Sequence, residues 1–222
     1  MLQSSAVEKA TFDLLVSLMK EPLLQSTRLV GGTSLALQIG HRKSTDLDLF
    51  SFEIPDIESI VSMLNERYGY TAQLITGKTT IGYIDGIKID VIYHPYHWLE
   101  DELVEGDIRL ATIGDISAMK MHAITNSGNR PKDFVDIAFL SQHYSYNRIK
   151  AMALDKYPMY DPIMFDRAII YFGDVNTEAI DKIKMLKSEM NWSKIERRII
   201  DMTNNPDKIF ATSPLKTNSN PG

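Results

Sequence analysis

The spacing of hydrophobic residues changes along the chain, and the change separates two kinds of structure. Residues 5–20 place apolar side chains at helical spacing, and Pro22 ends the run. Strand and helix patterns then alternate up to about residue 110. Only helical patterns follow, at residues 114–126, 131–143, 146–156, 162–172, 177–190 and 193–203. The sequence therefore predicts an α+β protein in two parts.

The alternating part predicts a mixed sheet. Apolar positions between residues 57 and 68 mark a helix, and strands are predicted near residues 70–76, 79–84 and 87–93, with Asp85-Gly86 as a hairpin turn. We expect an α/β domain at residues 1–110 and an all-helical domain at residues 111–208. Residues 209–222, where small and polar residues predominate, are expected to form a flexible tail.

Two aspartates interrupt an apolar stretch. In Asp46-Leu47-Asp48-Leu49-Phe50 polar and apolar residues alternate, so a strand would carry both carboxylates on one face. Neighbouring ionised carboxylates repel each other, and a divalent metal ion held by oxygen ligands relieves that repulsion. The pattern predicts a metal site at Asp46 and Asp48. The alternative is an edge strand with solvated charges.

A Gly-Gly-Thr turn joins a short predicted strand to a short predicted helix at residues 33–39. Glycines let the backbone come close to a ligand, and the free N–H groups at a helix N-terminus favour phosphate. We therefore expect the turn to bind nucleotide phosphates through Gly31, Gly32, Thr33 and Ser34. A phosphate site next to metal-binding carboxylates indicates phosphoryl or nucleotidyl transfer.

A third carboxylate lies on a later predicted strand. The apolar residues at 87, 89 and 91 share one face, and Lys88 and Asp90 share the other. If this strand pairs near the strand of Asp46, Asp90 completes a carboxylate triad. Three carboxylates can hold two metal ions, which clamp the attacking and leaving oxygens of a displacement. The alternative for Asp90 is an ordinary exposed strand face.

The order of these features resembles the DNA polymerase β-like nucleotidyltransferase superfamily. The blocks LVGGTSLALQIGHRKSTDLDLF and IGDISAMKMHAITNSGNRPKDFVDIAFL resemble, more narrowly, the AbiEii-type nucleotidyltransferase toxins of bacterial type IV toxin–antitoxin and abortive infection systems. The resemblance spans roughly residues 25–205. It implies that residues 1–110 are the catalytic domain, that the aspartate triad binds Mg²⁺ and that the glycine turn positions the NTP. It also matches Lys120 and the Lys-Asp-x-x-Asp helix of Asp133 and Asp136 to the family's site.

The residues themselves leave the role of Lys120 open. Lys120 falls within an apolar helix face, where an ammonium group needs an anionic partner or a wet cleft. That partner is either the triphosphate or one of Asp133 and Asp136, which lie three residues apart on the only polar strip of the next helix. The two aspartates could instead pair with the basic residues at 41–43. Arg42, Asp133 and Asp136 are taken as nucleotide-binding candidates.

Composition narrows the class of protein. The absence of cysteine excludes disulfides, thiolate catalysis and cysteine-bound zinc. No apolar run of about 18 residues predicts a membrane span, and the first residues lack the features of a signal peptide. These observations predict a cytoplasmic protein with no membrane partner.

The net charge of −5 requires any nucleic-acid contact to come from a local basic patch. Lys184, Lys187, Lys194 and Arg198 would form one stripe on a continuous helix, suited to an RNA backbone. The sequence Ser193-Lys-Ile-Glu196, however, is a capping box that predicts a helix start and would break the stripe. A solvated face is the alternative.

The sequence predicts a Mg²⁺-dependent enzyme that moves a nucleoside monophosphate from an NTP to an acceptor hydroxyl. By resemblance, the acceptor is an RNA such as tRNA, or a protein, the effect is growth arrest, and a cognate antitoxin is a candidate partner. Two alternatives are a small-molecule nucleotidyltransferase of the aminoglycoside-modifying type and a non-catalytic nucleotide-binding or partner-binding module. The intact carboxylates argue against the second.

Overall fold

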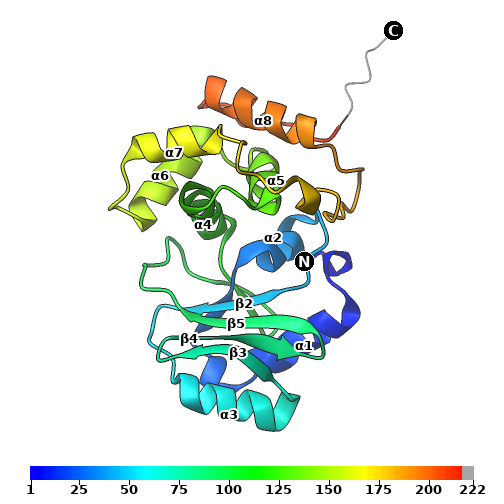
Figure 1. Cartoon of the computed structure of the whole chain (residues 1–222), viewed down its shortest axis with the longest axis vertical. Coiled ribbons are helices and arrows are strands. Elements are labelled where there is room, and N and C mark those ends of the chain that lie inside the picture. Colours follow the sequence, from blue (N-terminus) through cyan, green and yellow to red (C-terminus); the bar gives the residue numbers. More distant parts are fainter. Residues whose placement is uncertain (217–222) are drawn as a thin grey trace. The chain divides into compact units, whose positions relative to one another are not determined.

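The computed structural model describes residues 1–216 and divides into two compact units, Met1–Thr112 and a second unit that begins at Ile113 (Figure 1). All strands of the sheet lie in the first unit, and the described part of the second is built from helices. The mixed α+β fold expected from the sequence is therefore confirmed. No helix in residues 1–216 is long and apolar enough to cross a membrane.

The described strands of the first unit form one seven-stranded mixed sheet in the order β3-β4-β5-β2-β1-β7-β6. The strands are β1 Thr27–Leu29, β2 Leu47–Ser51, β3 Thr71–Thr76, β4 Thr79–Ile84, β5 Ile87–Tyr93, β6 Leu103–Glu105 and β7 Ile108–Leu110. β2 runs antiparallel to β1 but parallel to β5. The sequence did not predict β6 and β7, because three residues are too few to show an alternating pattern.

The sheet has one apolar face and one largely polar face. Leu47, Leu49, Ile89 and Val91 are fully buried, and the residues between them on each strand point to the other face. Figure 1 shows α1 (Lys9–Met19) and α3 (Ile57–Tyr68) on one side of the sheet and α2 (Gly31–Ile39) on the opposite side. Short 3-10 turns precede and follow α1, at Ser4–Ala6 and Pro22–Leu24.

The hairpin between β4 and β5 forms where the sequence predicts it. Ile84 pairs with Ile87 across the turn, and Asp85 and Gly86 have φ angles of 48° and 78°. Asp and Gly tolerate this left-handed conformation, and two such residues in succession match the twist of the flanking strands. This turn brings Lys88 and Asp90 into the sheet at a fixed register.

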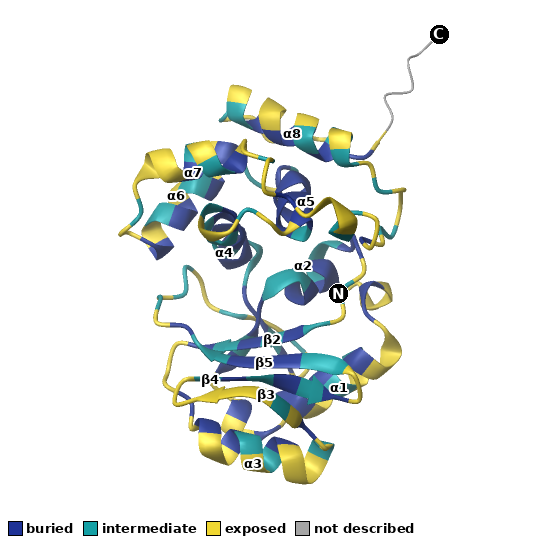
Figure 2. Ribbon diagram, viewed as in Figure 1, coloured by how far each residue is buried: buried dark blue, intermediate teal, exposed yellow. Residues whose placement is uncertain are grey.

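Five α-helices make up the described part of the second unit. They are α4 Ile113–Asn126, α5 Pro131–Leu140, α6 Tyr146–Lys156, α7 Pro162–Ile169 and α8 Trp192–Asn204. α4 packs against α5, α6 and α7, and α8 packs against α5. α8 buries an inward stripe and exposes its outer face (Figure 2), whereas α5 is buried along almost its whole surface. The core of this unit therefore forms around α4 and α5.

Three sequence-based helix predictions need correction. The helix expected at residues 177–190 is wrong, because only the 3-10 turn Thr177–Ala179 forms there. Ile183 is the single buried residue between positions 177 and 190, so a helix in this segment would gain little from packing. α5 and α7 also end earlier than expected, at Leu140 and Ile169.

The start of α8 differs in detail from the predicted capping box. The Asn191 side chain accepts a hydrogen bond from the Lys194 backbone N–H at 3.0 Å, which makes Asn191 the N-cap. Ser193 lies inside the helix and does not cap it. The predicted helix start is present, and the basic residues at 184 and 187 do not share a helix with Lys194 and Arg198.

Part of the expected flexible tail is packed. The Phe210 N–H donates to the Ser141 carbonyl at 2.9 Å, and Phe210 and Leu215 are both buried. Residues 209–216 are therefore attached to the helical unit, which corrects the prediction for this part of the segment. Residues 217–222 of the predicted tail lie outside the described residues.

Candidate active site

The sheet places two of the three predicted carboxylates side by side. In the parallel pairing of β2 and β5, Asp48 is the register partner of Asp90. Asp46 lies just before β2, and its Oδ1 accepts a hydrogen bond from the Thr45 hydroxyl at 3.1 Å. The sequence predicted that Asp90 would join the two aspartates if its strand paired beside theirs. β5 does pair with β2, so this condition is met.

Gly31 makes room for the Asp48 carboxylate at the start of α2. Its φ is +69°, and a Cβ atom built on it would lie 2.3 Å from Asp48 Oδ2. The carboxylate therefore lies directly against the backbone of the glycine turn. Only glycine satisfies both the left-handed backbone and this close approach.

The hydroxyl groups of the turn point into the protein. Thr33 is buried, its Oγ1 donates to the Asp46 carbonyl oxygen at 2.5 Å, and Oγ1 also lies within hydrogen-bond distance of Ser44 Oγ, at 2.9 Å. Ser34 is also buried, and its Oγ accepts a hydrogen bond from Gln38. Thr33 fastens α2 to the segment before β2, whereas the Ser34 bond to Gln38 stays within α2. A phosphate at this turn would be bound by backbone N–H groups and not by the two hydroxyls.

Arg42 lies behind the same turn. A Cβ atom on Gly32 would come within 2.3 Å of Arg42 Nη2, and Nη1 donates to the Lys43 carbonyl at 3.1 Å. The Arg42 side chain is almost completely buried. Its positive charge therefore adds to the electropositive end of α2, in the first unit and next to the predicted phosphate position.

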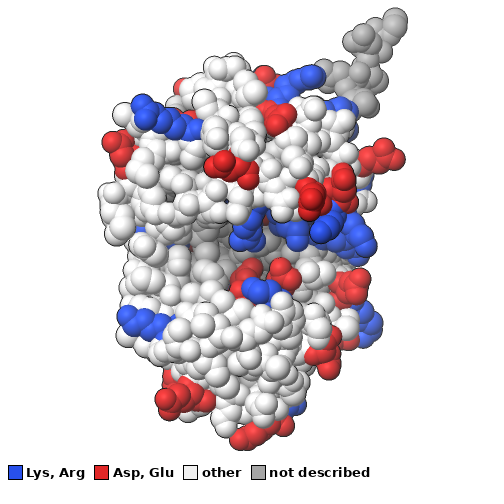
Figure 3. Space-filling view, viewed as in Figure 1, with Lys and Arg blue, Asp and Glu red and all other residues white. Residues whose placement is uncertain are grey.

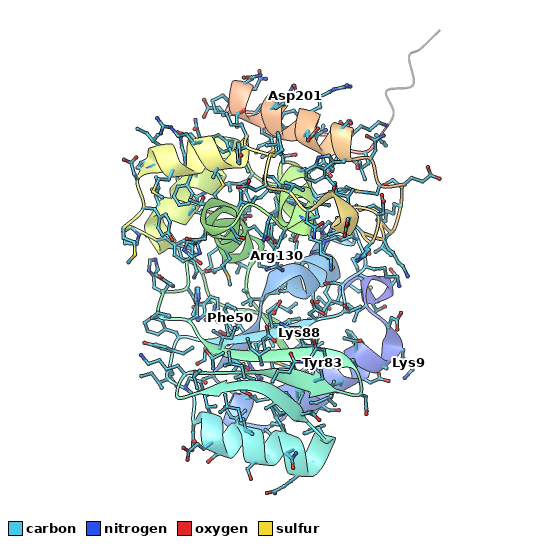
Figure 4. The ribbon with its side chains drawn as sticks, in the orientation of Figure 1. Lys9, Phe50, Tyr83, Lys88, Arg130 and Asp201 are labelled. Carbon is cyan, nitrogen blue, oxygen red and sulfur yellow. The ribbon has the colours of Figure 1, made fainter. Side chains whose placement is uncertain are left out.

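Lys88 is a site residue to which the sequence interpretation gave no role. Its Nζ forms an ion pair with Asp90 Oδ2 at 2.5 Å. Burial alone lowers the pKa of Lys88, but the hydrogen bond to Asp90 and the negative charges of Asp90, Asp48 and Asp46 outweigh burial and raise it. Figure 4 shows Lys88 and Phe50 on the side of the sheet that carries α2. The sequence feature that could have indicated this role is the position of Lys88, two residues before Asp90 and on the same strand face.

The carboxylates suit an oxygen-liganded metal ion, although no three His, Asp or Glu side chains of residues 1–216 are gathered as a complete ligand set. Asp90 is 7% exposed, and its Oδ1 is buried without a hydrogen-bond partner. An orphaned carboxylate oxygen is costly unless a cation or a donor meets it. With Asp48 on the adjacent strand, the donors match the preference of Mg²⁺ for carboxylate oxygens. Binding of Mg²⁺ here stays a prediction.

In the second unit, Lys120 pairs with both candidate aspartates. Its Nζ lies 2.6 Å from Asp133 Oδ1 and 2.8 Å from Asp136 Oδ2. All three side chains are buried, and Arg130 approaches the other oxygen of Asp133 at 3.6 Å. The sequence left two kinds of anionic partner open for Lys120, the triphosphate and the two aspartates. The structure shows Lys120 paired with both aspartates. The assignment of these residues to nucleotide binding remains a prediction.

A comparison with protein families identifies the chain. The family described as "Nucleotidyl transferase AbiEii toxin, Type IV TA system" matches residues 13–211. The chain belongs to this family. The AbiEii family makes it a nucleotidyltransferase, as the glycine turn and the paired carboxylates had suggested.

Similar proteins come from two other organisms. An uncharacterised protein of Aquifex aeolicus (strain VF5) is 29% identical over 174 residues, which cover 76% of this chain and 82% of that protein. The crystal structure of JHP933 from Helicobacter pylori matches with a TM-score of 0.59 at 16% identity, over 90% of this chain and 93% of JHP933. At that identity the likeness shows that the fold is shared.

Replacing Gly31 with alanine should abolish transfer and lower the free energy of unfolding by about 1–2 kcal/mol, the usual cost of a left-handed non-glycine residue. The added Cβ atom would also push the Asp48 carboxylate out of position. Gly69→Ala is the matched control, because Gly69 has φ +68° and nothing within 4 Å of its would-be Cβ. Thermal melting should show destabilisation in both variants, at least as large in Gly31→Ala, and transfer assays should show lost activity only in Gly31→Ala.

Replacing Lys88 with methionine should strengthen divalent-metal binding and lower the stability of the metal-free protein. The variant removes the ammonium that neutralises Asp90, which leaves the Asp90 carboxylate without its ion pair opposite the carboxylate of Asp48. We expect the free energy of unfolding without metal to fall by about 1–3 kcal/mol. Mn²⁺ titration and melting in EDTA measure the two effects, with the exposed Lys78→Met as control. Weaker metal binding in Lys88→Met would show that the ammonium does not compete with a cation.

Proposed function

We propose that this chain transfers a nucleoside monophosphate from an NTP to an acceptor hydroxyl, with Mg²⁺ bound by Asp46, Asp48 and Asp90. The observation that carries the proposal is the register pairing of Asp48 with Asp90 beside the Gly31 turn. This arrangement sets acidic metal ligands next to a helix N-terminus that favours phosphate.

The proposed reaction is an in-line displacement. The acceptor oxygen forms a bond to the α-phosphorus, the bond from that phosphorus to the bridging oxygen breaks, and pyrophosphate leaves with the electron pair. The backbone N–H groups of the Gly31 turn hold the β- and γ-phosphates. Asp90 Oδ1, which is buried and has no hydrogen bond within the described residues, is placed to accept the proton of the acceptor hydroxyl. Bound Mg²⁺ supplies neutralisation of the charge that develops on the phosphate oxygens.

Membership of the family supports proposals for the acceptor and the partner. We propose an RNA such as the 3′ end of tRNA as acceptor, with a protein side chain as the alternative, and growth arrest as the effect. Membership of a type IV toxin–antitoxin family supports a cognate antitoxin as partner. Lys120 would neutralise phosphate charge, by resemblance to the family's lysine.

The direct test is to incubate the protein with each α-labelled NTP, Mg²⁺ and total cell RNA, and to find where the label goes. Label on RNA that requires Mg²⁺ is the expected result. Label on an added aminoglycoside but not on RNA would support the small-molecule alternative. Absence of label on RNA, protein and small molecule with every NTP would overturn the proposal.

Toxicity should depend on the same carboxylates. Expression of the wild-type chain without a partner is expected to slow bacterial growth, and Asp46→Ala or Asp90→Ala should restore growth at equal protein level. Growth curves with immunoblots measure both quantities. Equal arrest by the wild type and both variants would mean that the arrest is not caused by nucleotidyl transfer.

A further inference from the structure

A basic pocket lies in the second unit, between α8 and the segment that follows it. Its volume is about 290 Å³, and Lys194, Arg197, Arg198, Asp201, Thr212, Ser213, Pro214 and Lys216 line it. Residues 194, 197, 198 and 201 are spaced to share one face of α8. Figure 3 shows Lys and Arg side chains where α8 and residues 210–216 of Figure 1 meet. The pocket is thus formed by two segments that the fold brings together.

Arg198 is the fixed element of this pocket. Its Nη1 donates to Ser141 Oγ and to the Thr212 carbonyl, both at 3.0 Å, and its guanidinium stacks on the Phe210 ring at 4.4 Å. The side chain is 8% exposed. These contacts hold the guanidinium in one orientation before any ligand arrives, which reduces the entropy lost on binding.

The described residues balance the positive charge of the pocket only in part. The lining holds four cationic side chains and one carboxylate, Asp201. Within residues 1–216 none of these cations forms a salt bridge, and the contacts of Arg198 are to neutral groups. Burial lowers the pKa of Arg198, and the charge of Asp201 opposes that shift only in part. A buried cation whose charge is only partly balanced is costly, so an anionic ligand would stabilise this site.

We propose that this pocket binds backbone phosphates of the acceptor RNA. The lining supplies cations, hydroxyl groups and a proline, but no exposed aromatic ring on which a base could stack. Such a surface recognises phosphate and not base identity. The inference rests on the proposed function for the identity of the RNA, and it assigns the acceptor contact to residues outside the two sequence blocks of the family resemblance.

The test measures RNA binding by the full chain without NTP, at several salt concentrations. The probes are labelled single-stranded oligouridylate and oligoadenylate, with inorganic phosphate as a separate ligand. The pocket variant combines Lys194→Gln, Arg197→Gln and Lys216→Gln and leaves the anchored Arg198 in place. The matched control combines Lys182→Gln, Lys184→Gln and Lys187→Gln, three exposed residues of the same unit with the same total charge change.

In the pocket variant, we expect RNA affinity to fall about tenfold or more at low salt. The slope of log affinity against log salt should drop by about 2, because each contacted phosphate of a single strand contributes about 0.7. The control should change little, both RNAs should behave alike, and NTP affinity should be the same in all three proteins. Equal losses in pocket variant and control, or an unchanged slope, would overturn the proposal, as would binding of inorganic phosphate without binding of RNA.

Transfer of label to RNA, measured in parallel, separates the two proposals. If the wild type labels RNA and the pocket variant binds RNA normally, the pocket assignment fails and the proposed function stands. If the pocket variant loses RNA affinity and the wild type labels no RNA, the pocket is supported and RNA is not the acceptor.

Discussion

The Asp48→Asn variant is expected to lose nucleotidyl transfer by about a hundredfold or more while it keeps its fold. Asp48 is the register partner of Asp90 and lies against the glycine turn, so it belongs to both halves of the site. Asparagine keeps the shape of the side chain and removes only its negative charge. A transfer assay with α-labelled NTP measures the loss, and full activity would contradict the assignment of Asp48 as a metal ligand.

Thermal melting separates this effect from a change in stability. Like charges directly opposite each other on neighbouring strands are destabilising, so without metal the variant should match the wild type or gain up to about 1 kcal/mol. The stabilisation that Mg²⁺ gives to the wild type should be absent from the variant. Asp85→Asn, at an exposed hairpin position that asparagine tolerates, changes the net charge equally and should alter none of these measurements.

The Lys120→Met variant is expected to lower the free energy of unfolding by about 3–5 kcal/mol, the range for removing one partner of a buried ion pair. Lys120 is enclosed with Asp133 and Asp136, so its loss leaves two buried carboxylates facing each other. Methionine fills the volume of the lysine stem, so packing itself should change little. Chemical denaturation measures the loss, and an undisturbed midpoint would show that the ion pairs add nothing to stability.

A second substitution distinguishes structure from function at this position. Adding Asp136→Asn to Lys120→Met removes one of the two buried negative charges, and Asp133 keeps its contact with Arg130. Most of the lost stability should return. If this folded double variant binds NTP as tightly as the wild type, Lys120 has only a structural role. If it binds NTP about tenfold or more weakly than the Asp136→Asn single variant, the ammonium contacts the nucleotide as well.

Hydrophobic periodicity predicted the long elements because their local pattern and their packing agree. The strands at residues 79–84 and 87–93 and the helix at 146–156 form where the pattern places them. Periodicity failed to predict the structure where a strand was too short to show a pattern, or where the apolar residues had no core to pack against. β6 and β7 have three residues each, and the apolar residues of 177–190 find almost no core to enter.

In the candidate site, too, local sequence predicted some features and tertiary packing decided others. The position of Asp48 on the strand face opposite Leu47 and Leu49 and the use of glycine at the turn follow from local rules, whereas Asp46, predicted on the same strand, lies just before it. The sequence could not show that the Thr33 and Ser34 hydroxyls turn inward, since their hydrogen bonds reach residues fixed by the packing of α2. Nor could it assign Lys88, whose role depends on charges from two strands.

By itself, the sequence determined the strand and helix periodicity, the face on which each carboxylate lies, and the resemblance that points to nucleotidyl transfer. These are local properties, set within a few residues by backbone geometry and side-chain alternation. Tertiary structure alone decided that β5 lies beside β2, that Lys120 is enclosed by two aspartates and that Lys216 joins the cations of α8. Each of these pairs residues distant in the sequence, and only the burial of a shared core brings such residues together.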